Sequence, residues 1–300
     1  RMSEVGAREA PLLDEEFLAR CAKLVLFSRS ITQGRLRGEK RSRRRGLSTE
    51  FADHKDYTPG DDLRHLDWNI FGRLEKLFIK LFEEEEERNV FLLLDASASM
   101  IEGEPDKWRH CRQIAAALGA IALSAGDRVH LRVFDEKMRP FFPALRGSRS
   151  ILRLIDTLEN LAPGKGTALG RSLRAHAASC PPGSIQILIS DLMDPKGLED
   201  ALRQVPGSRG ESWLVHLLAG NEVEPDLQGD LRLLDTETSE YVDVTLTRSV
   251  VEAYRRAVEE FRADLRNHCQ RFRIQPLEVS TSIPFDQVIL EWMRQKRWLT

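Results

Sequence analysis

The segment VFLLLDASAS, residues 90–99, joins a continuous apolar run to a loop of small polar residues. Five apolar residues in succession are typical of a strand that is buried on both faces, as in a parallel sheet. A second run, rich in isoleucine and leucine at 185–189, leads to Asp191, just as the first leads to Asp95. We therefore expect two buried strands of a parallel sheet, each followed by a carboxylate at its C-terminal end.

Helical and extended patterns alternate on both sides of these runs. Apolar residues at helical spacing alternate with short apolar strands, and this alternation is typical of βαβ units. Helices are predicted for residues 107–125, 150–161, 168–178 and 198–204, and further strands for 128–134 and 212–219. The sequence thus predicts an α/β fold with a doubly wound, mostly parallel sheet.

The flanking segments follow a looser pattern. We expect a helix at 15–28, irregular structure or short strands at 29–62, and a strand at 77–82 on the N-terminal side. On the C-terminal side we expect a hairpin at 231–246, a helix from Thr247 to about Arg271, a strand at 272–279 and a helix at 286–298. The predicted division is 1–87, an N-terminal region that packs on the core; 88–222, the α/β domain; and 223–300, a C-terminal α/β extension.

Composition limits the classes of partner. The chain has 300 residues with a formal net charge of -2, and no apolar run is long enough to span a bilayer. We read the basic segment 35–45 and the acidic run 83–87 as solvated segments, and we expect no nucleic-acid partner. The four cysteines form no CxxC pair, and no apolar stretch of signal-peptide length begins the chain. We therefore expect reduced thiols and a cytoplasmic protein.

Oxygen-bearing side chains are predicted to meet at one edge of the sheet. Asp95, Ser97 and Ser99 follow the first buried strand, Thr167 lies in a glycine-rich loop before a helix, and Asp191 follows the second buried strand. Ligands of doubly wound sheets bind outside the carboxyl ends of the strands. Hard cations prefer such oxygen donors, so the set predicts Mg²⁺, with Mn²⁺ or Ca²⁺ as alternatives. An ion held largely by neutral hydroxyls favours one more anionic oxygen, for example from a protein partner.

This arrangement resembles the metal-ion-dependent adhesion site of von Willebrand factor A domains. In such domains an Asp-x-Ser-x-Ser motif follows a buried strand, a threonine follows in a later loop, and an aspartate follows a later strand. Asp95, Ser97, Ser99, Thr167 and Asp191 match those five positions in order. The resemblance implies a metal-dependent module that binds a protein and catalyses no reaction.

A second resemblance involves residues 50–69, EFADHKDYTPGDDLRHLDWN. This segment is similar to the signature of a bacterial family of unknown function that pairs it with an A-like domain. Genes of that family commonly lie beside those for MoxR-type AAA+ ATPases. The resemblance implies an adaptor or co-chaperone that acts with such an ATPase on an unidentified protein client.

Other interpretations of the same residues remain open. Asp95 and its serines could merely cap a helix, and the chain could be a metal-free structural interaction protein. The acidic cluster near Asp61 could instead serve a metal-dependent hydrolase or nuclease, although a turn rich in structural carboxylates explains it more simply. Loop 163–167 lacks P-loop spacing, and Ser97 does not lie in a Gly-x-Ser-x-Gly motif.

Overall fold

The computed structural model describes most of the chain, and its residues form two compact units. One unit comprises Arg1–Leu36 with Arg88–Thr300, and the other comprises Arg37–Glu87. The sequence-based boundaries between residues 87 and 88 and between 222 and 223 stay predictions. The described residues are 11–26, 49–59, 63, 66–74, 76–84, 87–101, 106–194, 198–205, 210–223, 229–234, 241–246 and 248–300.

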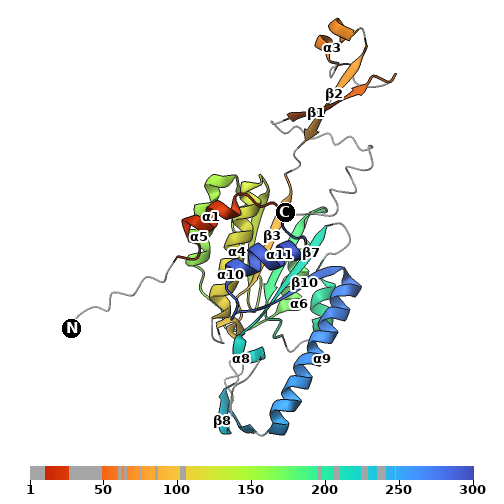
Figure 1. Ribbon diagram of the computed structural model, residues 1–300. Helices are drawn as coiled ribbons and strands as arrows, with labels where there is room; N and C mark the ends of the chain where they lie inside the picture. Colours follow the sequence, from red (N-terminus) through yellow and green to blue (C-terminus); the bar gives the residue numbers. More distant parts are fainter. Residues whose placement is uncertain are drawn as a thin grey trace, which may run out of the picture. The chain divides into compact units, whose positions relative to one another are not determined.

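A six-stranded sheet forms the centre of the larger unit (Figure 1). Its strand order is β10-β7-β6-β3-β4-β5, and every neighbouring pair is parallel except β4 and β5. This arrangement confirms the predicted doubly wound, mostly parallel α/β fold. The strands are β3 (Asn89–Asp95), β4 (Arg128–Phe134), β5 (Leu145–Arg146), β6 (Ile185–Ser190), β7 (Glu211–Leu218) and β10 (Ile274–Ser280).

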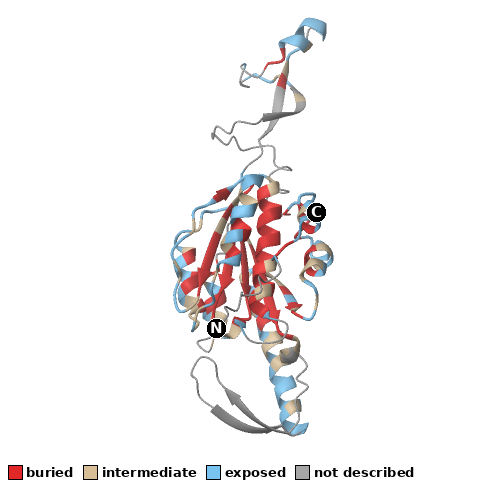
Figure 2. Cartoon of the chain, turned by 90° about the vertical axis from the view of Figure 1, so that its left-hand side faces the viewer, coloured by how far each residue is buried: buried red, intermediate tan, exposed pale blue. Residues whose placement is uncertain are grey.

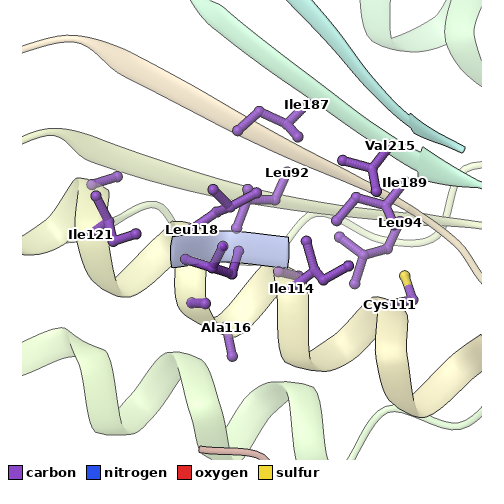
Figure 3. Close-up of a cluster of buried hydrophobic side chains, with 14 of the residues drawn as sticks. Leu92, Leu94, Cys111, Ile114, Ala116, Leu118, Ile121, Ile187, Ile189 and Val215 are labelled. Atoms are coloured by element: carbon purple, nitrogen blue, oxygen red, sulfur yellow. The ribbon is translucent and has the colours of Figure 1, made fainter. Parts of the chain in front are cut away.

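The central strands are buried on both faces, as their apolar sequences predict (Figure 2). Successive side chains of a strand point to opposite faces of the sheet. Leu92 and Leu94 accordingly join one hydrophobic cluster, whereas Leu93 joins a second cluster on the other face. Figure 3 shows Leu92 beside Leu118 of α4 (Lys107–Ser124) in the first of these clusters. Burial on both faces explains why no polar residue interrupts this part of β3.

Helix α4 packs along the first face of the sheet and is itself almost entirely buried. A Cβ atom at Gly119 would clash with the Leu154 side chain, so glycine permits α5 (Ile151–Glu159) to approach α4 closely. The same cluster includes residues of α1 (Glu15–Cys21) and of the C-terminal helices. These last elements are α10 (Phe285–Gln287), the π-helical turn η4 (Val288–Trp292) and α11 (Met293–Gln295).

The second face is covered by α6 (Leu169–Ala177), α7 (Leu198–Arg203) and α9 (Arg248–Phe272). Leu173 and Leu202 pack with Leu93 in this cluster. Helix α9 is mostly exposed, and Leu265 and Cys269 are the residues that it buries among those described. Arg273 follows it with a φ of 57°, which turns the chain directly into β10. The chain beyond residue 222 therefore supplies an edge strand of the main sheet.

Smaller elements complete both units. In the unit Arg37–Glu87, the strands β1 (Thr49–Asp56) and β2 (Phe78–Glu84) are antiparallel, and α3 (Trp68–Leu74) lies between them in sequence. The larger unit has an antiparallel hairpin of β8 (Gly229–Leu234) and β9 (Tyr241–Leu246). It also has the 3-10 helices η2 (Ala98–Ile101) and η3 (Ser148–Ser150) and the short α8 (Gly220–Val223).

Two predicted helices differ from the expected ones. Helix α1 begins where Asp14 accepts a hydrogen bond from the Phe17 amide, but it ends at Cys21 rather than at Ser28. Leu26 instead forms a β-bridge with Leu299, a long-range pairing that local periodicity cannot reveal. The predicted helix at 286–298 is divided into α10, η4 and α11.

Candidate metal centre

Two strand ends bring the predicted carboxylates together. Strands β3 and β6 pair in parallel, with Leu94 opposite Ile189. The next residues, Asp95 and Ser190, therefore end their strands side by side, and Asp191 follows directly. The sequence predicted that Asp95 and Asp191 lie at one edge of the sheet, because the carboxyl ends of parallel strands meet at the same edge.

Asp95 is held by hydrogen bonds from both strand ends. Its Oδ1 accepts from the Ser97 amide at 3.0 Å, and its Oδ2 accepts from the Ser190 hydroxyl at 2.6 Å. The Ser190 hydroxyl in turn accepts from the Leu192 amide at 2.8 Å. Asp95 is only 2% exposed, and this burial, together with the nearby charge of Asp191, raises its pKa to about 7. The hydrogen bonds therefore fix the position of Asp95, but its negative charge is not fully compensated by nearby positive charge.

The two serines of the motif converge beside this carboxylate. The Ser97 and Ser99 hydroxyl oxygens lie 3.1 Å apart, and Ser97 is buried while Ser99 is half-buried. The 3-10 helix η2 begins at Ala98 and directs both side chains from one tight turn. Two neutral oxygens and a buried carboxylate thus occupy a single loop.

The loop that carries Thr167 is tied to the same edge. The Gly164 amide donates to the Ala96 carbonyl at 2.6 Å, and the Ala168 amide donates to the Asp135 carbonyl. A Cβ atom at Gly164 would crowd the Asp135 side chain, which explains the glycine at this position. These backbone contacts place the loop against the end of β3, and Thr167 itself is half-buried.

Asp191 forms an ion pair that the sequence did not predict. Lys107 at the start of α4 places its Nζ 2.8 Å from Asp191 Oδ2 and 2.6 Å from Glu222 Oε1. The Lys107 side chain is 1% exposed. Burial opposes its charge, but the two carboxylates outweigh that effect and raise its pKa above the usual value. Lys107 therefore remains an ammonium ion inside the protein.

Further contacts fix the carboxylates of this loop. The Met193 amide donates to Asp191 Oδ1 at 3.2 Å, so Asp191 has a partner on each oxygen. Asp194 accepts from the Leu169 amide at 2.9 Å and so joins the Asp191 loop to the first turn of α6. Glu222 accepts from the Ala219 amide through its other oxygen. Local sequence patterns do not reveal the roles of Lys107, Ser190, Asp194 and Glu222, because each contacts a residue on a distant segment.

The donor set suits a hard divalent cation. Asp95, Asp191 and Glu222 place three carboxyl groups around the single positive charge of Lys107. Acidic groups therefore outnumber the cation in this group. Oxygen is the only donor element among the predicted ligands, as Mg²⁺ prefers. Across the described part of the chain, no cluster of three or more His, Cys, Asp and Glu side chains could hold a metal. The predicted set differs from such clusters because three of its five members are hydroxyls.

The acidic cluster near Asp61 is described only in part. Asp61, Asp62 and His65 lie outside the described residues, as does the basic segment 35–45. Asp67 has a structural role, because its Oδ1 accepts from the Asn69 and Ile70 amides at the start of α3. Its Oδ2 lies 3.0 Å from His54 Nε2. These contacts agree with a structural role for this carboxylate of the acidic cluster.

The chain is similar to an uncharacterised protein in sequence and to several solved structures. An uncharacterised protein of Mycobacterium bovis is 25% identical over 258 residues, which cover 84% of this chain and 81% of the relative. The conserved hypothetical protein BatB from Bacteroides thetaiotaomicron covers 70% of this chain and 98% of its own, at 16% identity and a TM-score of 0.44. A von Willebrand factor type A structure from Catenulispora acidiphila covers 48% of this chain and 36% of its own, at 21% identity and a TM-score of 0.33.

A family match spans most of the chain. Residues 53–264 match the family described as "Protein of unknown function DUF58". The matched span contains all five predicted metal ligands and most of the signature at 50–69. The chain therefore belongs to the DUF58 family, whose function is unknown.

Proposed function

We propose that the chain is a divalent-metal-dependent protein-binding module that acts as an adaptor or co-chaperone of a MoxR-type AAA+ ATPase. The observation that carries this proposal is the convergence of the Ser97 and Ser99 hydroxyls beside the buried Asp95 carboxylate. When bound, a divalent ion would supply a positive centre that favours a carboxylate from a protein partner. The partner and the client are proposals drawn from the family resemblance.

The five predicted ligands would divide the task. Ser97, Ser99 and Thr167 would hold the ion through their hydroxyl oxygens, and Asp95 and Asp191 would supply negative charge behind them. Asp95 is already oriented by the Ser97 amide and the Ser190 hydroxyl. A ligand whose position is fixed before binding loses less entropy when the complex forms.

Apolar side chains around the motif support a protein partner. Ile101 in η2 is 49% exposed, and Met193 beside Asp191 is 45% exposed. Both belong to the loops that carry the predicted ligands. Exposed apolar side chains near convergent polar groups are common at protein interfaces. We propose that these side chains pack against the partner while its carboxylate approaches the metal centre.

The proposal includes no catalytic step. Within the described residues, the Ser97 and Ser99 hydroxyls contact each other rather than a histidine, so they do not form the usual pair of nucleophile and general base. We also propose a cytoplasmic location. In the described part of the chain, no helix combines the length and the apolar character needed to cross a membrane.

A binding assay with the purified 300-residue chain tests the proposal. The chain would be immobilised and incubated with a purified MoxR-type ATPase from the same organism, in Mg²⁺ or in chelator. We expect retention in Mg²⁺ to fall about tenfold or more in chelator, and to fall equally for the Ser97→Ala/Ser99→Ala variant. Chelator should have little further effect on that variant, because both changes act on one site.

A matched control distinguishes the effect of removing the motif hydroxyls from the effect of removing any two serine hydroxyls. Ser148 and Ser150 have the same spacing in another 3-10 helix of the larger unit. The Ser148→Ala/Ser150→Ala variant should bind the ATPase as the unchanged chain does, with the same dependence on Mg²⁺. If retention of the ATPase is unchanged both by chelator and by the Ser97→Ala/Ser99→Ala substitutions, the metal centre is not the docking point.

A further inference from the structure

Lys107 is an unusual residue to find at a proposed divalent-metal centre. Its ammonium group is 1% exposed and lies within ion-pair distance of one predicted metal ligand, Asp191. A buried lysine is costly unless it is paired and hydrogen-bonded. Its partners therefore matter, and both of them are carboxylates.

The position of Lys107 also opposes an ordinary structural explanation. It is the first residue of α4, where the positive end of the helix dipole disfavours a cation. Among the described residues, the carboxylates of Asp191 and Glu222 contact the ammonium and offset both that cost and the cost of burial. The ammonium thus lies where negative charge is concentrated, which is also where a divalent cation would be attracted.

The ion pairs of Lys107 with Asp191 and Glu222 join three separate segments of the fold. Lys107 begins α4, Asp191 follows β6, and Glu222 lies in α8 after β7. Glu222 also accepts from the Ala219 amide at 2.8 Å, which fixes it to the end of β7. The ammonium therefore connects the ends of two adjacent strands to the helix that follows the Asp-x-Ser-x-Ser loop.

We infer that Lys107 is a built-in cation of the metal centre, which holds Asp191 in place without metal and competes with a divalent ion for its carboxylate. The inference rests on the proposed function, because it assumes that Asp191 belongs to that centre. The Lys107 pKa, raised by both carboxylates, agrees with a permanent charge. In this arrangement, the affinity for metal is set by a residue that is not itself a ligand.

The test measures Mn²⁺ binding by calorimetry on the 300-residue chain and on four variants of it. Lys107→Met removes the ammonium and frees Asp191 Oδ2. Lys107→Met/Glu222→Gln does the same but keeps the net charge of the group unchanged, and it avoids burying an extra unpaired carboxylate. Ser97→Ala/Ser99→Ala removes the proposed hydroxyl ligands, and Lys296→Met removes an exposed lysine after α11 as a control.

We expect both Lys107 variants to bind Mn²⁺ more tightly than the unchanged chain, by about tenfold or more, because the ammonium no longer competes for Asp191. Lys296→Met should bind Mn²⁺ as the unchanged chain does. A gain in Lys107→Met/Glu222→Gln would show that release of Asp191, and not net charge alone, raises the affinity. A second measurement is the shift in melting temperature on adding Mg²⁺, which should be larger for the double variant than for the unchanged chain.

The outcomes distinguish this inference from the proposed function. Mn²⁺ binding that is lost in Ser97→Ala/Ser99→Ala but unchanged in folded Lys107→Met/Glu222→Gln overturns the inference and leaves the metal centre standing. If only the Lys107→Met/Glu222→Gln variant binds Mn²⁺, the ammonium takes the place of the ion in the unchanged chain. This result would support the inference and overturn the metal-dependent function. Absence of Mn²⁺ binding in every folded variant would overturn both.

Discussion

The buried Asp95 carboxylate should destabilise the metal-free protein at alkaline pH. Its pKa is raised from 3.8 to about 7, first by burial and then by Asp191. The folded protein therefore holds a proton on Asp95 between these two values, where the unfolded chain has lost it. Stability consequently falls as pH rises through this window, and the full penalty is present above about pH 7.

The substitution Asp95→Asn removes this penalty with little change of shape. A pKa shift of about 3 units corresponds to roughly 4 kcal/mol at most. Asparagine can keep the hydrogen bond from the Ser97 amide, but the Ser190 hydroxyl loses an acceptor, which costs about 1 kcal/mol. We expect metal-free Asp95→Asn to be more stable than the unchanged chain by roughly 2–3 kcal/mol at pH 8, and by less at pH 5.

Urea unfolding in chelator, followed by circular dichroism at pH 8 and pH 5, measures the difference. The control is Asp127→Asn, because Asp127 is 3% exposed and accepts from Arg88 Nε at 2.8 Å and Arg88 Nη2 at 2.6 Å. Losing that buried pair should cost about 3–5 kcal/mol at both pH values. Destabilisation by Asp95→Asn at pH 8, or a difference between it and the unchanged chain that does not depend on pH, would refute the reasoning.

Three further predictions concern packing and acid stability in the larger unit. Gly119→Ala should lower the free energy of unfolding by about 1–2 kcal/mol, because its Cβ would clash with Leu154. In a chemical denaturation series, this loss should disappear when Gly119→Ala is introduced into a Leu154→Ala background, where the clash is absent. Burial lowers the pKa of His176 from 6.5 to about 4, so acidification through this range should cost about 3 kcal/mol, and His176→Asn should flatten the measured dependence of stability on pH. Trp298 stacks on Trp213 with ring centroids 4.8 Å apart, so Trp298→Ala should cost about 3–5 kcal/mol by urea unfolding, and a smaller loss would show that the C-terminal segment contributes little.

Local sequence patterns predicted the main sheet well. The run at 90–94 and the run at 185–189 became β3 and β6, and the expected strand at 128–134 became β4 with the same bounds. Strand burial on both faces leaves a continuous apolar signature, and amphipathic helices leave a periodic one. Both signatures are local, so they can be read without knowing which segments pair.

The candidate site was predictable only in outline. Asp95 and Asp191 could be placed at one edge because each follows a strand of the same parallel sheet. The hydrogen bond from Ser190 to Asp95 could not be foreseen, since it joins residues far apart in the sequence. A serine at a strand end can form several kinds of local hydrogen bond. The pairing of β3 with β6 brings Ser190 beside Asp95, so that its hydroxyl donates to that carboxylate.

The sequence by itself determined the alternation of the main strands and helices after residue 88, the doubly wound class and the positions of Asp95, Ser97 and Asp191 after buried strands. Only the tertiary structure decided that Lys107 is buried between Asp191 and Glu222, which are 84 and 115 residues away from it. The physical reason is that lysine usually lies at the surface, and the burial of Lys107 is stabilised by the two carboxylates that folding brings to it.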